Sequence, residues 1–380
     1  MRLVMSAGEA SGDQIAADLA RALGDRVPGI EMAGLAGPRM EAAGVQPWYG
    51  LDTLNVMGLT EVIAHLPRLL RLRREYRQRI LAWQPDAFIS IDAPDFNLGL
   101  ARQLRRRGLT TIHYVSPSVW AWRAHRIKKI ARSLDLLLTL FPFEPELYRP
   151  HGLEARFVGH HLADELRTLP DREPLRGQLG VSEGQPLIVL LPGSRGGEIQ
   201  RHAGLLADAA SRLRRRYSDA MLVMLLARRD HKAQVLALAG NALAEAGVTL
   251  VADETRIGLA AADVAIAASG TVTLEAFLVG CPQVVFYRLP PSTYWLARLL
   301  RLVKTRHVSL PNILTGQGLV PERLQDAASA EQLCLDAIAW LERPGQVRDY
   351  KLLAEAWRTR LGRGAGDQAA EAILEKLGHG

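Results

Sequence analysis

Two short turns of the sequence each carry a pair of carboxylates. Glu9 and Asp13 lie in SAGEASGD after an apolar run of strand length, and Asp92 and Asp95 lie in ISIDAPDFN after another. Open α/β sheets place their active sites at the carboxyl ends of strands. A partly desolvated carboxylate there can take a proton from a hydroxyl group. Asp92 is the first candidate for such a base, and Glu9 would share the task or orient an acceptor.

Helix capping is the simpler interpretation for any one of these four carboxylates taken alone. Asp13 and Asp95 fit that interpretation, since each is followed by a helical pattern. Capping does not account for all four together.

A glycine-rich loop joins a strand to a helix in LIVLLPGSRGGEI, with Gly193, Ser194 and Arg195 at the junction. Backbone N–H groups at a helix start can bind phosphate. The Arg195 guanidinium can add a charge-assisted contact to an oxygen of a diphosphate leaving group. A tight turn without a ligand is the alternative.

A second helix start follows in ASGTVTLEAF, where Ser269, Gly270 and Thr271 open the helix and Glu275 lies on the same face as Thr271. An ordinary N-cap is one interpretation. In the other, the first three residues hold a pyrophosphate while Glu275 accepts hydrogen bonds from ribose hydroxyls. Two such starts in one half of the chain favour a nucleotide site.

Strand-length apolar runs alternate with segments of helical period, which predicts an α/β fold with parallel sheets. A linker rich in Pro, Gly and charge follows Pro170. We expect two Rossmann-like domains facing a central cleft, at residues 1–168 and 169–340. The remaining residues, 341–380, are expected to form terminal helices that pack back on the first domain.

Composition narrows the function classes. The formal net charge of +7 over 380 residues favours acidic partners. Cys281 and Cys334 have no partner spacing, and His160 and His161 are adjacent, so neither a disulfide framework nor a metal site is expected. The sequence shows no export signal and no apolar run of 18 residues, so we expect a cytoplasmic chain without a spanning helix.

Three further segments are suited to apolar or lipid contacts. HYVSPSVWAWR contains His113, Ser116, Ser118, Trp120, Trp122 and Arg123, which fit a sugar or acyl pocket and core packing equally. Two basic amphipathic segments fit either an anionic lipid surface or a core-facing helix with a solvated face. The first contains Val62, Ile63, Leu66, Leu69 and Leu70 among arginines, and the second is TYWLARLLRLVKTRH, residues 293–307.

The motifs GEASGD, VMGLTEV, IDAPDFN, HYVSPSVWAWR, LPGSRGGEI, ASGTVTLEA and SLPNILTGQ, in this order, resemble those of the lipid-A-disaccharide synthases. The resemblance implies an inverting glycosyltransferase of the GT-B type. The family's catalytic Asp falls on Asp92, its N-terminal carboxylate on Glu9 and its UDP-contacting Arg on Arg195. Its ribose Glu falls on Glu275 and the Asn of its LPN segment on Asn312.

The implied reaction joins UDP-2,3-diacylglucosamine to 2,3-diacylglucosamine 1-phosphate through a β-1,6 link, with loss of UDP and without a cofactor or metal. The resemblance also places the acyl-contacting patch on the segment from Val62 to Leu70. A peripheral position on the inner face of the cytoplasmic membrane and a possible homo-oligomer are expected, without nucleic acid. The alternatives are another two-Rossmann transferase, a UDP-N-acetylglucosamine epimerase and a non-catalytic protein that binds membranes or senses nucleotides.

Overall fold

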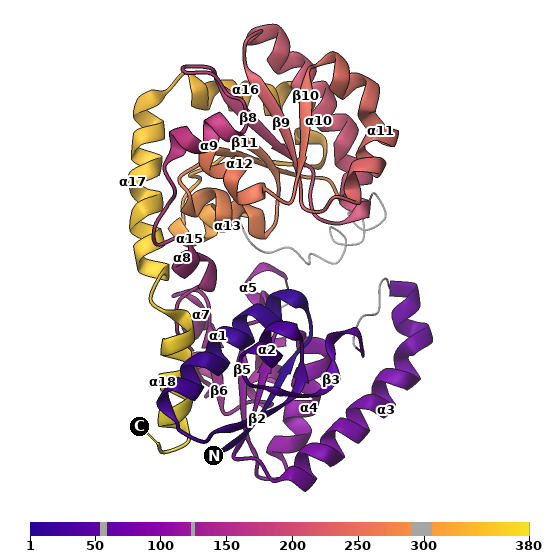
Figure 1. The fold of residues 1–380 in the computed structure, drawn as a ribbon, viewed down its shortest axis with the longest axis vertical. Coiled ribbons are helices and arrows are strands. Elements are labelled where there is room, and N and C mark those ends of the chain that lie inside the picture. Colours follow the sequence, from indigo (N-terminus) through magenta and orange to yellow (C-terminus); the bar gives the residue numbers. More distant parts are fainter. Residues whose placement is uncertain (54–58, 123–125, 291–305, 380) are drawn as a thin grey trace. The chain divides into compact units, whose positions relative to one another are not determined.

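The computed structural model describes residues 1–53, 59–122, 126–290 and 306–379. The chain divides into two compact units (Figure 1). Unit 1 consists of Met1–Asp164 with Leu361–Gly380, and unit 2 consists of Glu165–Arg360. Each unit contains one parallel sheet covered by helices, which confirms the predicted α/β class with two Rossmann-like domains.

The sheet of unit 1 has the strand order β3-β2-β1-β4-β5-β6-β7, and every pairing is parallel. The central strands are apolar on both sides, as expected for a sheet that helices cover on both faces. The strands are β1 (Arg2–Ala7), β2 (Glu31–Ala36), β3 (Gln46–Gly50), β4 (Ala87–Ile91), β5 (Thr110–Tyr114), β6 (Leu136–Thr139) and β7 (Glu154–Phe157).

From β1 the chain adds strands toward one edge of the sheet, up to β3, and from β4 it adds them toward the other edge, up to β7. The helices that connect the strands therefore lie on opposite faces of the sheet of unit 1. Helices α3 and α4 contact each other, and α1 contacts α18 (Figure 1). The helices are α1 (Ala10–Arg26), α2 (Pro38–Ala42), α3 (Leu59–Trp83), α4 (Pro94–Arg105), α5 (Val119–Trp122), α6 (Ile127–Ala131), α7 (Glu144–Tyr148), α8 (His161–Glu165) and α18 (Ala365–Lys376). Because α8 ends at Glu165, its last residue is the first of unit 2.

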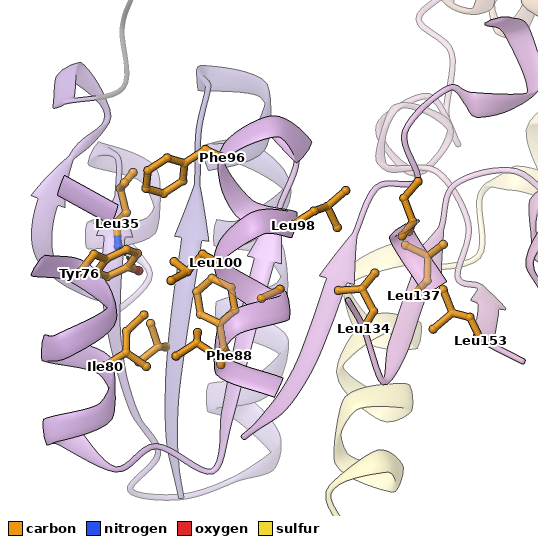
Figure 2. Packing of buried hydrophobic residues seen from close by; sticks show 14 of the residues in the cluster. Leu35, Tyr76, Ile80, Phe88, Phe96, Leu98, Leu100, Leu134, Leu137 and Leu153 are labelled. Atoms are coloured by element: carbon orange, nitrogen blue, oxygen red, sulfur yellow. Dashed lines mark hydrogen bonds between the residues drawn. The ribbon is translucent and has the colours of Figure 1, made fainter. Parts of the chain in front are cut away.

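The core of unit 1 includes the inner face of α3. Leu72, Tyr76 and Ile80 follow one another at four-residue spacing and are buried with Leu35 and Phe88 (Figure 2). The Tyr76 hydroxyl donates to the Met5 carbonyl at 3.2 Å and accepts from the Leu35 N–H at 3.1 Å. A buried hydroxyl needs such partners, and here they fix α3 against β1 and β2.

Within its described side chains, α3 is therefore a core-facing helix with a solvated basic face. Arg68, Arg71 and Arg74 are exposed on that face, and Leu70 is 51% exposed beside them. The Val62, Ile63 and Leu66 side chains of the predicted acyl patch lie outside the described residues. So does the second basic segment, except for Arg306 and His307. No helix in the described parts of the chain has the length and apolarity to cross a bilayer.

The sheet of unit 2 has the order β10-β9-β8-β11-β12-β13, also with parallel pairings only. This is the doubly wound order 3-2-1-4-5-6 of the Rossmann fold. Its strands are β8 (Leu187–Leu191), β9 (Met221–Leu226), β10 (Val248–Ala252), β11 (Val264–Ala268), β12 (Gln283–Tyr287) and β13 (Glu322–Leu324). Its helices include α9 (Arg172–Gln178), α10 (Gly196–Arg216), α11 (His231–Glu245), α12 (Thr255–Ala261), α13 (Thr271–Leu278), α15 (Leu310–Thr315), α16 (Ala330–Leu341) and α17 (Pro344–Leu361).

The C-terminal helices divide between the units, unlike the expected packing of residues 341–380 on the first domain. Helix α17 packs on unit 2 because the buried Tyr350 ring contacts Phe277 and Trp340. Helix α18 packs on α1 of unit 1, where Asp164 accepts hydrogen bonds from the first N–H groups of α18. The unit boundaries accordingly fall at 164/165 and 360/361 rather than after 168 and 340.

Candidate active site

The two carboxylate turns of unit 1 meet where β1 and β4 lie side by side. Ala7 pairs with Ile91, so the residues that follow both strands leave the sheet at the same level. A Cβ atom built on Gly12 would lie 3.6 Å from Cβ of Asp92. The strand order changes direction between these two strands, and such a switch point is where open α/β sheets bind ligands.

Asp92 is held in a constrained turn. Asp92 and Ala93 both have positive φ angles, +51° and +44°, which are unfavourable for residues other than Gly. The buried Asn97 amide donates to the Asp92 carbonyl at 2.9 Å and accepts from the Ser6 hydroxyl at 2.9 Å. Burial raises the pKa of the Asp92 carboxyl above its usual range, against the opposing N–H of Ala93. A carboxylate with such a pKa is a stronger base.

The other two carboxylates of these turns have structural partners. Asp13 lies inside α1 and accepts from the N–H groups of Gly37 and Met40 at 3.0 and 3.1 Å, so it caps α2 and not its own helix. Asp95 does not cap α4, because Ala93 is the N-cap residue and the Asp95 carboxylate pairs with Arg126. The capping interpretation was therefore wrong about which helix Asp13 serves and wrong for Asp95.

The two glycine-containing loops of unit 2 also meet at a switch point. Strands β8 and β11 are adjacent, with Leu191 opposite Ala267, so both loops leave the same edge. Arg195 is the N-cap residue of α10, and Gly270 is that of α13. The two loops that the sequence indicated for one nucleotide site therefore follow neighbouring strands, and their role in binding stays a prediction.

Glu198 occupies the amide groups of the first loop. Its Oε2 accepts from the N–H groups of Ser194 and Arg195 at 2.9 and 3.2 Å, and its Oε1 accepts from the Tyr287 hydroxyl at 2.9 Å. Two N–H groups that we expected to face a phosphate therefore already bind an internal anion. The Arg195 side chain is 83% exposed, which leaves its guanidinium open to a ligand.

The second loop leaves its helix start open to solvent. Gly270 and Thr271 are exposed, and the Ser269 hydroxyl donates to the Val308 carbonyl at 3.2 Å. Glu275 is largely buried and accepts from Nε of Arg256 at 3.2 Å. Arg256 also bonds Glu165, at 2.6 Å. This guanidinium fixes one carboxylate oxygen of Glu275, a partner that the sequence did not reveal.

Asn312 is not placed to touch a ligand. It is 1% exposed, and its amide exchanges two 2.9 Å hydrogen bonds with the backbone of Val320. Its amide nitrogen also donates to Glu322, which accepts from the N–H groups of Val308 and Ser309. The expected direct contact is therefore corrected to a structural one: Asn312 holds the segment that Ser269 contacts.

The aromatic segment HYVSPSVWAWR begins inside β5, and its described side chains show core packing. His113 is fully buried in the strand, where burial lowers its pKa to about 4. Trp120 is partly exposed and packs edge to face on Phe143, with ring centroids 5.8 Å apart. Nearby, burial raises the pKa of Glu144 to about 7, although the N–H groups of Leu140 and Phe141 donate to its carboxylate.

Asn97, Glu198, Arg256 and Glu322 are the positioning residues that sequence reasoning missed. Only Glu198 had a local signal, since it lies three residues after the N-cap residue, as in a capping box. Asn97 and Arg256 each bond a partner 91 residues away, Ser6 and Glu165 respectively.

Solved structures that contain nucleoside diphosphates share this fold. MnaA of S. aureus in complex with UDP has a TM-score of 0.68 at 14% identity, over 100% of this chain and 98% of that chain. The spinosyn rhamnosyltransferase SpnG, complexed with thymidine diphosphate, has a TM-score of 0.59 at 15% identity, over 99% and 100%. The two Rossmann-like sheets place the chain in the GT-B fold class.

The model of the family described as "Lipid-A-disaccharide synthetase" matches residues 3–375. The lipid-A-disaccharide synthase of Chromohalobacter salexigens is 46% identical over 380 residues, which cover 100% of this chain and 98% of that relative. The chain belongs to the lipid-A-disaccharide synthetase family. The resemblance inferred from its motifs is thereby confirmed.

Proposed function

We propose that this protein is a lipid-A-disaccharide synthase. It condenses UDP-2,3-diacylglucosamine with 2,3-diacylglucosamine 1-phosphate, and the products are the β-1,6-linked disaccharide 1-phosphate and UDP. The family match over residues 3–375 carries the proposal. The two pairs of loops at the switch points of the sheets support it, because they supply a candidate base in unit 1 and a candidate nucleotide site in unit 2.

In the proposed mechanism, Asp92 takes the proton of the acceptor 6-hydroxyl group while that oxygen attacks the anomeric carbon of the donor. The bond from the anomeric carbon to UDP breaks on the opposite face, so a single displacement inverts the centre. Arg195 and the start of α13, with Ser269, Gly270 and Thr271, stabilise the charge that develops on the diphosphate. In this mechanism Glu9 orients the acceptor.

Glu275 accepts hydrogen bonds from the ribose in this proposal. Glu198 keeps the loop of Gly193 and Ser194 closed on itself, and its Oε1 lies 3.9 Å from Nη1 of the exposed Arg195 side chain. The proposed nucleotide contacts of this loop therefore come from side chains more than from its backbone. Asn312 contributes indirectly, through the segment that contacts Ser269.

We further propose that the chain works in the cytoplasm as a peripheral protein on the inner face of the cytoplasmic membrane. Both substrates carry acyl chains, so the enzyme must meet them at a lipid surface. The exposed basic face of α3, with Arg68, Arg71 and Arg74 around Leu70, supports such a contact. A homo-oligomer remains a prediction.

Asp92→Asn tests the mechanism. Because general-base catalysis contributes about 10² to 10⁴ in rate, we expect turnover to fall by that factor while UDP affinity is unchanged. Turnover is measured with purified donor and acceptor lipids, by detecting the released UDP and the disaccharide. UDP affinity is measured by calorimetric titration. Asp95→Asn is the matched control, since the exposed Asp95 carboxylate pairs with Arg126. We expect this variant to keep near-normal turnover.

The pH dependence of kcat/KM is a second test of Asp92 as the base. Only the deprotonated base is active, and the raised pKa of Asp92 shifts the acidic limb of kcat/KM to a higher pH than an ordinary aspartate near 3.9 gives. Normal turnover in Asp92→Asn contradicts the assigned base. A product that is an epimerised nucleotide sugar, without disaccharide, contradicts the function itself.

A further inference from the structure

A pocket lined by arginines lies at the amino-terminal edge of the sheet in unit 1. The end of α4, the turn into β5 and the turns that follow α6 line a pocket of about 430 Å³ that is open to solvent. Its lining consists of Arg102, Arg105, Arg106, Gly108, Leu109, Thr110, Arg132 and Asp135. Thr110, in the pocket, is the first residue of β5, whereas Asp92 follows the end of the neighbouring strand β4. The length of the strand, about five residues or roughly 16 Å, therefore separates the pocket from the proposed base.

The one carboxylate of the pocket is already fully engaged. Asp135 accepts from Nε of Arg105 at 2.8 Å and from the N–H and hydroxyl of Thr111 at 2.9 and 3.1 Å. Burial opposes ionisation here, but the hydrogen bonds from Arg105 and Thr111 hold the pKa of Asp135 below its usual range. Asp135 and Arg105 thus neutralise each other.

Three other guanidinium groups of the pocket have no anionic partner among the described residues. Within the described parts of the chain, no acidic group pairs with Arg102, Arg106 or Arg132. Arg102 and Arg106 are four residues apart and share one face of the helix end, an arrangement in which like charges repel. The negative end of a helix dipole favours an arginine at each helix terminus. The helix dipole does not explain why the arginines at the ends of α4 and α6 line the same pocket.

We propose that this pocket binds a phosphate group, as a second anion site separate from those for the donor and the acceptor. The planar fork of an arginine matches two phosphate oxygens, and several such forks around one cavity match a dianion. The cavity is larger than a phosphate ion and falls in the usual range for small-molecule sites, so it accommodates a phosphate ester. Free phosphate and a phospholipid headgroup share this chemistry.

The Arg102→Gln/Arg106→Gln double variant tests the site, because it removes two unpaired charges and keeps the pair of Arg105 with Asp135. Arg343→Gln/Arg348→Gln is the matched control, since it removes two exposed charges from unit 2. Calorimetric titration with inorganic phosphate, at saturating UDP to occupy the donor site, measures the free ion. Cosedimentation with vesicles of phosphatidylcholine, with and without phosphatidylglycerol, measures the headgroup.

Weakening of phosphate binding by about ten-fold or more in the double variant alone supports a site for the free ion. If the double variant loses binding to phosphatidylglycerol vesicles but not to inorganic phosphate, the pocket is a headgroup site. Arg132→Gln, on a different segment, must reproduce either effect with an unchanged unfolding midpoint. Wild-type binding of both probes by the double variant overturns the proposal. Equal losses in the double variant and the control also overturn it, because they indicate a general effect of charge.

Discussion

Arg256 fixes the carboxylate that we assign to the ribose. Its guanidinium joins Glu275 and Glu165, so Glu275 can turn only if that pair breaks. Arg256→Gln should leave Glu275 free to rotate and to bind water. We expect the preference of the protein for UDP over 2′-deoxy-UDP to shrink, by about the 1.5 to 3 kcal/mol that hydrogen bonds to charged groups contribute.

Calorimetric titrations with the two nucleotides measure this preference. A merely structural role for Arg256 weakens both affinities equally, whereas an orienting role weakens UDP and spares 2′-deoxy-UDP. Arg216→Gln is the control, because Arg216 also pairs with a glutamate, Glu342, but at the far end of α10. Equal losses for both nucleotides in Arg256→Gln would show that Arg256 has a structural role and does not orient Glu275 toward the ribose.

At the scale of the element, the loop before α10 keeps its conformation only because residue 193 is a glycine. Gly193 has φ = +113°, and a Cβ atom there would lie 2.5 Å from Oε2 of Glu198. Gly193→Ala therefore strains the backbone and pushes the Glu198 carboxylate away from the N–H groups of Ser194 and Arg195. We expect a loss of about 1 to 3 kcal/mol in the free energy of unfolding, together with weaker UDP binding.

Gly204→Ala, in the same helix, is the matched control for urea unfolding and UDP titration. No atom lies within 4 Å of a Cβ built there, and its φ is not positive. Alanine is favoured over glycine in a helix interior by about 0.5 to 1 kcal/mol, so this variant should be slightly more stable. If Gly193→Ala unfolds at the same urea concentration as wild type, the carboxylate does not hold the loop as the structure indicates.

At the scale of the whole molecule, the sequence predicted the fold class, because alternation of strand and helix patterns limits the topology. It did not predict most side-chain partners. Asp13 caps a helix that begins at Pro38, and Asn312 bonds Val320 across a turn, contacts that leave no periodic signal. Asp92 and Glu9 could be proposed from the sequence because they follow strands, which is a local feature.

The sequence also did not predict that the C-terminal helices divide between the two units. Helices α17 and α18 both have an apolar face, and neither pattern says which core receives it. In the structure, Tyr350 of α17 accepts from the amide of Gln283 at 3.1 Å, whereas Asp367 of α18 pairs with Arg26 at 2.8 Å. Contacts of this kind join residues far apart in the sequence, so the local pattern of each helix does not contain them.

This division makes a prediction for local stability. Ile373 of α18 is fully buried in unit 1, and Tyr350 of α17 is 1% exposed in unit 2. Ile373→Ala should cost about 2 to 5 kcal/mol and Tyr350→Ala about 3 to 5 kcal/mol, because each leaves a cavity. Amide hydrogen exchange reports each unit separately.

We expect Ile373→Ala to lower protection in β1 and α1, more than three hundred residues earlier, and to leave β8 and β11 unchanged. Tyr350→Ala should lower protection in β12 and α13 and spare β1, since its ring contacts Phe277 and its hydroxyl bonds Gln283. Loss of protection in β8 and β11 by Ile373→Ala contradicts the assignment of α18 to unit 1. UDP affinity gives a second readout, because only the Tyr350 variant should reduce it.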